Sequence, residues 1–207
     1  MRVRAMFLRR RSVDRLLLAG TAVCLALIFL ASCGGGSPLS NPSTIVNDPA
    51  SVQGQKLSFV YFQECIDPIL NAQLTIHQNG VTSVNSCAGS GCHDTVNGTG
   101  GALRVVPGAA VVDTTTSTPD VIRTTDMYRN YYSSQGMTIV GAPTQSRLIN
   151  KPQVNGTLHG GGLIFDDPND LNLKKMAYWI SHPMPQGQDE FSDAAQAMFD
   201  AGQCKTQ

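Results

Sequence analysis

The sequence predicts a small all-α domain built from short helices joined by long loops. Three observations favour this class. Apolar side chains recur at helical spacing in several short stretches. Alternating strand patterns are few, and the intervening segments are rich in glycine, serine, threonine and asparagine. Long loops are uncommon in a compact domain, but a large apolar cofactor would give them a surface on which to pack.

Apolar stripes define the expected helices. The first covers residues 59–70, with Ser58 as its N-cap and Pro68 as a kink or the start of a new turn. Residues 79–118 are expected to form a loop. Four further helical segments are expected at residues 120–132, at residues 146–151, around Leu173, Met176, Ala177 and Ile180, and around Phe191, Ala194, Ala195, Met198 and Phe199.

Residues 1–32 are predicted to be a lipoprotein signal peptide. Six arginines occupy the first fifteen positions, an apolar run follows over residues 16–30, and small residues precede Cys33. This order is typical of a secretory signal. The letters LASC at its end match the bacterial lipobox, whose cysteine is acylated and becomes the new N-terminus. An uncleaved signal anchor is the alternative, although the apolar run is short for a membrane span.

The mature chain is predicted to be anchored in the bacterial cell envelope. Acyl chains on Cys33 would hold it to a membrane. The following glycine favours the outer membrane, on its periplasmic or outer face, in the lipoproteins that this segment resembles. Residues 33–56 are expected to be the lipid anchor and a flexible linker, with an ordered arm as the alternative. The domain is expected to span residues 57–207.

The balance of charged residues changes at Cys33. Six of the fifteen basic residues and one of the fifteen acidic residues precede Cys33, which leaves nine basic and fourteen acidic side chains. A mildly acidic chain argues against a nucleic-acid partner. It favours docking to a basic patch on a partner protein.

The most specific motif is CAGSGCH at residues 87–93. Cys87 and Cys92, followed directly by His93, predict covalent haem attachment: the two sulfurs form thioethers with the haem vinyl groups and the imidazole binds iron. Four residues separate the cysteines instead of the usual two, and the glycines among them let the extra backbone loop out. The alternatives are a disulfide between these cysteines and a zinc site that includes His93.

The other cysteines predict a disulfide. Of the six cysteines, Cys24 leaves with the signal peptide, Cys33 carries lipid, and two belong to the motif. Cys65 and Cys204 remain, on the expected first and last helices. Because an exported protein rarely keeps two unpaired thiols, we expect these two to be bonded.

Six motifs follow one another along the chain: FQECIDPIL at 62–70, CAGSGCH at 87–93, GGALRV at 100–105, SRLINKP at 146–152, HGGG at 159–162 and KMAYWI at 175–180. In this order they resemble class I c-type cytochromes, and more closely the planctomycete-type cytochrome c domains. The resemblance implies a helical domain that wraps one covalent haem c, with Tyr178 and Trp179 packed near it. The four-residue spacer and residues 181–207 depart from the family's pattern.

The resemblance leaves two candidates for the second axial ligand. His159 precedes three glycines, at a place where related domains carry histidine instead of methionine. Met184 lies between two prolines, as in the Met-Pro turn of many class I cytochromes, but it follows the helix that the family's ligand loop precedes. We favour His159, and an open sixth position is the further alternative. A pair of imidazoles would lower the reduction potential relative to His/Met ligation.

The expected function is single-electron transfer by a membrane-anchored monohaem cytochrome, without catalysis. Two strong axial ligands leave no position for a substrate at the iron. A haem enzyme with an open distal site, of peroxidase type, is one alternative. A lipoprotein without haem, holding a structural zinc or a disulfide, is the other.

Overall fold

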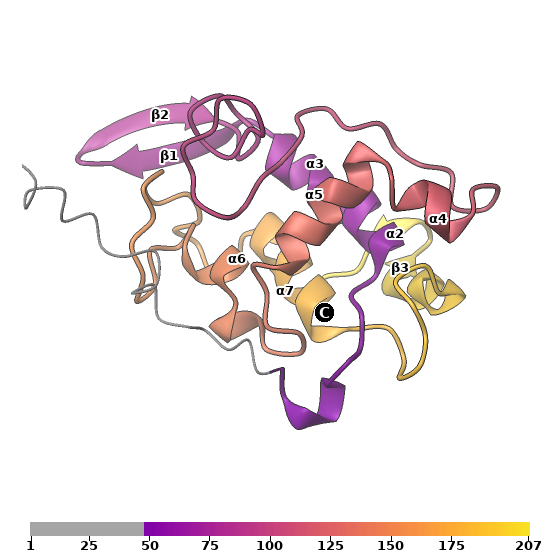
Figure 1. Cartoon of the computed structure of the whole chain (residues 1–207). Coiled ribbons are helices and arrows are strands. Elements are labelled where there is room, and N and C mark those ends of the chain that lie inside the picture. The colour runs from indigo at the N-terminus through magenta and orange to yellow at the C-terminus, as the bar shows by residue number, and fades with distance from the viewer. Residues whose placement is uncertain (1–47) are drawn as a thin grey trace, which may run out of the picture. The chain divides into compact units, whose positions relative to one another are not determined.

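The structure is a computed structural model that describes residues 48–207 (Figure 1). The predicted signal peptide and Cys33 lie outside the described residues. Within residues 48–207, no helix has the length and apolar character that crossing a bilayer requires. The elements in chain order are η2 (Ala50–Val52), α2 (Phe59–Tyr61), η3 (Phe62–Ile66), α3 (Asp67–Asn71), β1 (Leu74–Gln78), β2 (Val81–Asn85), α4 (Pro119–Ile122), α5 (Asp126–Gln135), η4 (Pro143–Gln145), α6 (Arg147–Asn150), α7 (Leu171–Ser181), η5 (Asp193–Met198), β3 (Phe199–Asp200) and β4 (Gln203–Cys204).

The prediction of an all-α domain is wrong. In the described part of the chain, the helices are joined by two antiparallel two-stranded sheets, β1–β2 and β3–β4. In the first sheet Leu74 pairs with Asn85, and the strands meet at a turn formed by Asn79 and Gly80. These two residues have φ of 51° and 77°, the pair of left-handed conformations that a type I′ hairpin needs. Asn-Gly between two segments that contain several β-branched residues is a hairpin signal, which the expectation of a loop over residues 79–118 overlooked.

The C-terminal segment also differs from the expected last helix. A 3-10 helix, η5, leads into the short β3–β4 hairpin, whose turn contains Ala201 at φ 47° and Gly202 at φ 79°. Cys204 therefore lies in a strand. The predicted Cys65–Cys204 disulfide is confirmed, with Cα atoms 6.0 Å apart across 139 residues of sequence. It joins the two ends of the described domain.

The first predicted helix forms as three consecutive segments, α2, η3 and α3. The Ser58 hydroxyl accepts a hydrogen bond from the Tyr61 N–H at 3.0 Å, which caps its start as expected. The central segment, η3, is a π-helical turn, and Pro68 lies in the first turn of α3. A proline is tolerated there because the first helical N–H groups have no partner within the helix.

The remaining predicted helices form with shifted ends. The segment expected at 120–132 divides into α4 and α5, because Thr125 ends the first turn and caps the second helix by accepting the Tyr128 N–H at 3.2 Å. Asp170 caps α7 by accepting the Leu173 N–H at 3.1 Å. Pro183 follows the end of α7.

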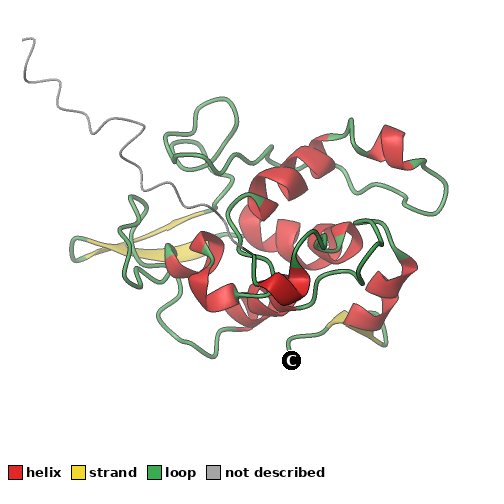
Figure 2. Ribbon diagram, turned by 60° about the horizontal axis from the view of Figure 1, so that its bottom comes forward, coloured by secondary structure: helices red, strands yellow, loops and turns green. Residues whose placement is uncertain are grey.

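The core lies between η3, α5 and α7. Figure 2 shows the helices gathered between the two small sheets. The Phe62 ring is 5.4 Å from Trp179 and 5.7 Å from Tyr131, measured between ring centres. Both polar ends of these buried aromatics are bonded: Trp179 Nε1 donates to the Ser58 carbonyl at 2.9 Å, and the Tyr131 hydroxyl donates to the Leu57 carbonyl at 2.8 Å. These bonds hold the N-terminal segment against the helices.

Residues 48–56, which the sequence analysis assigned to the linker, contact the domain. The Asp48 carboxylate accepts a hydrogen bond from the Val140 N–H at 2.8 Å. The Gln55 amide donates to the Met184 carbonyl at 2.6 Å. These contacts join residues 48–56 to the domain that was expected to begin at residue 57.

Candidate functional site

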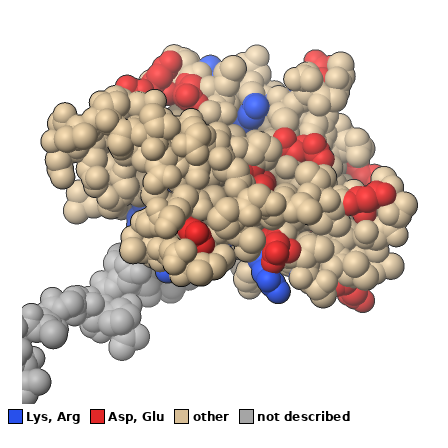
Figure 3. All heavy atoms as spheres, turned by 90° about the horizontal axis from the view of Figure 1, so that it is seen from above, with Lys and Arg blue, Asp and Glu red and all other residues tan. Residues whose placement is uncertain are grey.

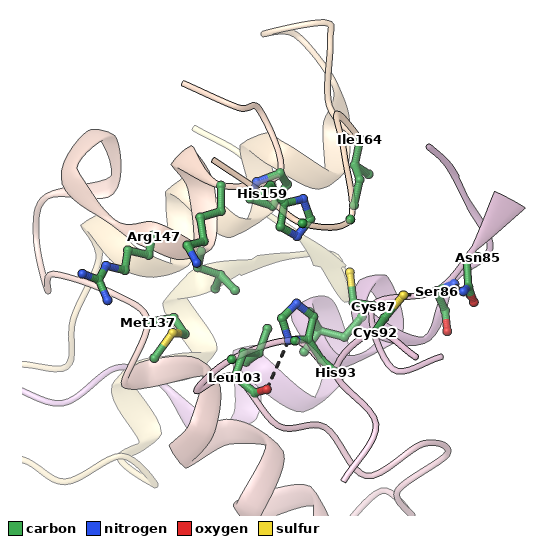
Figure 4. Close-up of a pocket in the computed structure, with 18 of the residues that line it drawn as sticks. Asn85, Ser86, Cys87, Cys92, His93, Leu103, Met137, Arg147, His159 and Ile164 are labelled. Atoms are coloured by element: carbon green, nitrogen blue, oxygen red, sulfur yellow. Dashed lines mark hydrogen bonds between the residues drawn. The ribbon is translucent and has the colours of Figure 1, made fainter. Parts of the chain in front are cut away.

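A cavity of about 320 Å³ lies between the segment that follows β2 and the segment that follows α6 (Figure 4). Such a volume is within the range of small-molecule and cofactor sites. Its apolar lining comes from several elements far apart in sequence, and both cysteines of the predicted haem motif also line it. The apolar lining residues include Ile69, Leu70, Ile76, Leu103, Met137, Leu148, Ile164, Phe165 and Met176.

The CAGSGCH segment forms the start of a loop that we call the motif loop, residues 87–105. It is closed by its own backbone: the His93 N–H donates to the Cys87 carbonyl at 2.9 Å, and the Gly100 N–H donates to the Cys92 carbonyl at 2.7 Å. Gly91 has φ 81°, a conformation that glycine adopts without strain. The four-residue spacer thus forms a tight turn that brings the two thiols to one wall of the cavity.

Both motif cysteines are free thiols, so the alternative of a Cys87–Cys92 disulfide is not what forms. Burial, and to a smaller extent the neighbouring Cys92, raise the pKa of the Cys87 thiol to about 11. Cys92 Sγ also accepts a weak hydrogen bond from the Asn85 amide at 3.5 Å. Cys87 is therefore a neutral thiol at neutral pH.

His93 is held inside the motif loop. Its Nδ1 bonds to the Leu103 carbonyl at 3.1 Å (Figure 4). A methyl group added at Gly100 would lie 2.6 Å from that same nitrogen, so only glycine leaves room for the ring. Burial lowers the pKa of the His93 imidazole, which favours the neutral form that can bind a metal.

His159 is held in a second segment, which we call the HGGG loop, residues 158–163. Its Nδ1 bonds to the Gly162 carbonyl at 2.7 Å, and the Gly162 N–H donates to the His159 carbonyl at 2.9 Å. Gly162 has φ 84°. The loop therefore closes on itself around the imidazole. The backbone conformation at Gly162 would be strained for a residue with a side chain.

The two imidazoles face each other across the cavity. Their ring centres are 6.3 Å apart and their planes differ by 9°. A carbonyl oxygen can only accept a hydrogen bond, so Nδ1 of each ring carries the hydrogen and Nε2 keeps a free lone pair. Figure 4 shows the rings of His93 and His159 reaching toward each other from opposite walls, with the cysteine sulfurs beside them.

This spacing suits one metal ion between two imidazoles. Two metal–nitrogen bonds of about 2.0 Å, with about 1.1 Å from each nitrogen to its ring centre, put the ring centres roughly 6 Å apart. Histidines that bind metals generally donate their other N–H to a carbonyl or carboxylate, which fixes the tautomer and the ring orientation. Both His93 and His159 have such a carbonyl partner.

The β1–β2 hairpin supports the HGGG loop from outside. His77 and Leu163 exchange backbone hydrogen bonds of 2.8 and 2.9 Å. The Gln78 amide donates to the Gly160 carbonyl at 2.5 Å. Since β2 runs directly into Cys87, one hairpin connects both walls of the cavity. Sequence reasoning missed this contribution together with the hairpin, although the Asn79-Gly80 turn could have revealed it.

Three other residues from the sequence analysis lie elsewhere. Met184 is buried next to residues 55–56, its N–H donating to the Lys56 carbonyl at 2.7 Å, and it is not among the cavity-lining residues. Tyr178 stacks on His182 with ring centres 3.9 Å apart. Trp179 packs in the core, as described above. Neither aromatic residue lines the cavity.

Residues 48–207 contain no metal-binding cluster of three or more side chains. No set of three or more histidine, cysteine, aspartate or glutamate side chains in this range is arranged to hold an ion. The site residues that the structure brings together are Cys87, Cys92, His93 and His159, as a thiol pair beside an opposed imidazole pair. Cavity-lining residues that the sequence did not single out include Met137, Arg147 and Lys151.

Comparisons of the chain with protein-family models, with curated proteins and with solved structures found no match in any of the three.

Proposed function

We propose that this chain is a membrane-anchored c-type cytochrome with one covalent haem, which transfers single electrons outside the cytoplasm. The opposed imidazoles of His93 and His159 are the observation that carries the proposal. The CAGSGCH motif supplies the chemical identity of the cofactor, because two cysteines followed by histidine are typical of haem attachment.

The described residues fit an iron porphyrin in three respects. Two imidazoles with free Nε2 lone pairs face each other at the spacing of a shared metal. Two unpaired thiols, Cys87 and Cys92, lie at the cavity wall, where vinyl groups would meet them. The lining is largely apolar, as a porphyrin face requires. When bound, haem supplies an iron centre that gains and loses one electron.

The chain's own residues have separate tasks in this proposal. Cys87 and Cys92 bind the haem edge covalently. His93 and His159 would occupy both axial positions, which leaves no place for a substrate and favours an electron carrier over an enzyme. Apolar side chains such as Leu103, Ile164 and Phe165 exclude water from the porphyrin. Histidine on both sides favours the ferric state, so the reduction potential would be low.

The envelope location is part of the same proposal. The signal peptide would direct export. Acylation of Cys33 and the linker that follows would then hold the domain at a membrane surface, where haem is attached after export. Figure 3 shows carboxylates and a few basic side chains scattered over one face of the domain. A net acidic mature chain suits a redox partner protein with a basic docking surface.

The test is expression of the full chain in a bacterium with working c-type maturation machinery. We expect the mature protein to carry the mass of one haem and an acylated Cys33, and to give a low-spin spectrum. A colourless, unmodified protein would refute the cytochrome and favour the lipoprotein without haem. A high-spin wild-type spectrum would favour the enzyme with an open site.

The second ligand is tested by substitution in the same system. His159→Ala is expected to convert low-spin to high-spin haem, because one axial nitrogen is lost. His182→Ala is the matched control, since His182 is exposed and stacks on Tyr178; its spectrum should equal that of the wild type. A low-spin spectrum that persists in His159→Ala but disappears in Met184→Leu would assign the position to Met184.

A further inference from the structure

The cavity has a cationic edge, formed by Arg147 and Lys151, to which the proposed function assigns no role. Arg147 and Lys151 both line the cavity, and no aspartate or glutamate is among the described residues that line it. The two cations are four residues apart, at the first position and the C-cap of α6, so they lie on the same side of that helix. Two positive charges beside an apolar cavity favour an anionic ligand.

Helix α6 is held firmly in place. The Ser146 hydroxyl, fully buried, accepts the Ile139 N–H at 2.8 Å and donates to the Ala142 carbonyl at 3.0 Å. Leu148 and Ile149 are buried in the core directly after Arg147. The backbone that presents the two cations is thus fixed by packing, next to the part of the cavity wall that the two residues line.

The cationic edge lies opposite the thiols. Figure 4 shows Arg147 on one side of the His93–His159 pair and the sulfurs of Cys87 and Cys92 on the other. A haem has the same asymmetry: its two vinyl groups lie at one edge and its two propionates at the opposite edge. A haem bonded through its vinyl groups to these cysteines would direct its carboxylates toward α6.

We propose that Arg147 and Lys151 bind the haem propionates. The proposal rests on the proposed function and adds the residues that recognise the anionic edge of the cofactor. Arginine suits a carboxylate because its guanidinium can donate two parallel hydrogen bonds, and the lysine ammonium adds a second compact charge. Together they neutralise the two propionates and raise the reduction potential relative to the same haem without them.

The experiment compares two double variants of the mature holoprotein. Arg147→Met with Lys151→Met removes the cationic edge. Arg129→Met with Lys174→Met removes the same charge elsewhere: Arg129 is exposed on α5 and pairs with Asp126, and neither residue lines the cavity. The measurements are the midpoint potential and the propionate bending band in the resonance Raman spectrum.

We expect the cavity variant to show a lower midpoint potential and a shifted propionate band, because uncompensated carboxylates stabilise the ferric state. The control should change neither by a comparable amount. The charge-conserving pair Arg147→Lys with Lys151→Arg should restore most of the potential. Equal potentials and identical Raman bands in the cavity variant and the control would overturn the proposal.

If the double variant does not mature, Arg147→Gln and Lys151→Gln are measured singly. A wild-type potential and Raman band in both single variants would also overturn the proposal, and a shift in either supports it. A wild-type protein without haem would refute the proposed function itself. A wild-type protein with haem, whose potential is insensitive to the cationic edge, would refute only this inference.

Discussion

The motif loop and the HGGG loop each present one histidine to the same cavity, but different contacts hold them. Within the motif loop, His93 is bonded to Leu103, packed against Gly100 and tied through its N–H to Cys87. All of these partners lie within the loop itself. The HGGG loop makes two bonds around His159 and depends for the rest on the β1–β2 hairpin, more than eighty residues earlier in the chain.

This difference teaches that one side of the site is encoded locally and the other by the fold. A loop that is closed by its own hydrogen bonds keeps its geometry whenever its segment is ordered. A loop that is held by a distant hairpin keeps its geometry only when the whole domain is folded. The HGGG loop should therefore be the more easily displaced of the two.

The largest effect is expected from removing the disulfide, which lies in neither loop. The double variant Cys65→Ser with Cys204→Ser releases a closed loop of 139 residues and should lower the free energy of unfolding by about 4–5 kcal/mol in the chain-entropy model. Denaturant unfolding under oxidising conditions measures it. A loss below 1 kcal/mol, or a change confined to one loop in hydrogen exchange, would contradict this view.

Glu190, which lies in neither loop, is expected to make a pH-dependent contribution to the free energy of unfolding. Burial alone would raise the pKa of its carboxyl, but hydrogen bonds from its own N–H, from Tyr128 and from Arg123 outweigh burial and lower it. A lowered pKa in the folded state gives stability that is present above the ordinary carboxyl range and is lost as the pH falls through the folded pKa.

Glu190→Gln is therefore expected to cost about 1.5–3 kcal/mol at pH 7, and less as the pH falls below the ordinary value of 4.5. Urea unfolding of both proteins between pH 3 and 7 checks it. Asp166→Asn is a suitable control, because Asp166 is an exposed carboxylate in the segment between α6 and α7. Parallel pH profiles for the wild type and Glu190→Gln would show that this carboxyl has no special role.

The two loops are compared directly by placing a methyl group behind each histidine. A Cβ at Gly100 would lie 2.6 Å from His93 Nδ1, whereas a Cβ at Gly161 would lie 3.1 Å from the nearest His159 ring atom. Gly100→Ala should cost about 1–3 kcal/mol, since the tightly bonded loop cannot yield. Gly161→Ala should cost clearly less, because the His159 ring can turn aside.

The two variants are compared by their free energies of unfolding and by the imidazole resonances of both histidines in NMR spectra. The Gly100→Ala spectrum should change at His93 and the Gly161→Ala spectrum at His159. If Gly161→Ala proves the more costly substitution, the HGGG loop is the more rigid of the two and the comparison is reversed.

The smallest effect is expected at Gln78. Gln78→Ala removes the hydrogen bond to the Gly160 carbonyl and should cost about 1 kcal/mol or less of global stability, because that carbonyl can bond to water. Hydrogen exchange should quicken in the HGGG loop and remain unchanged in the motif loop. Gln135→Ala serves as the control on α5. An equal acceleration of hydrogen exchange in both loops would mean that the hairpin does not stabilise the HGGG loop alone.

Several features were predictable because they depend on neighbours in sequence. The caps at Ser58, Thr125 and Asp170 follow from side chains that reach N–H groups two or three residues away, although the sequence analysis named only the first. The Cys65–Cys204 bond followed from counting cysteines in a chain that is predicted to be exported. The β1–β2 hairpin was also signalled locally, by Asn79-Gly80, and was overlooked because the flanking segment is rich in loop-forming residues.

What the sequence determined alone is the motif loop: the spacing of its cysteines, the adjacent histidine and the glycines that let the backbone close around them. Only the tertiary structure decided that His159 faces His93 at 6.3 Å, that Met184 lies outside the cavity lining, and that Arg147 lies opposite the thiols. The physical reason is range. Bonds within a loop are set by local geometry, whereas contacts between segments tens of residues apart exist only after packing has closed the chain between them.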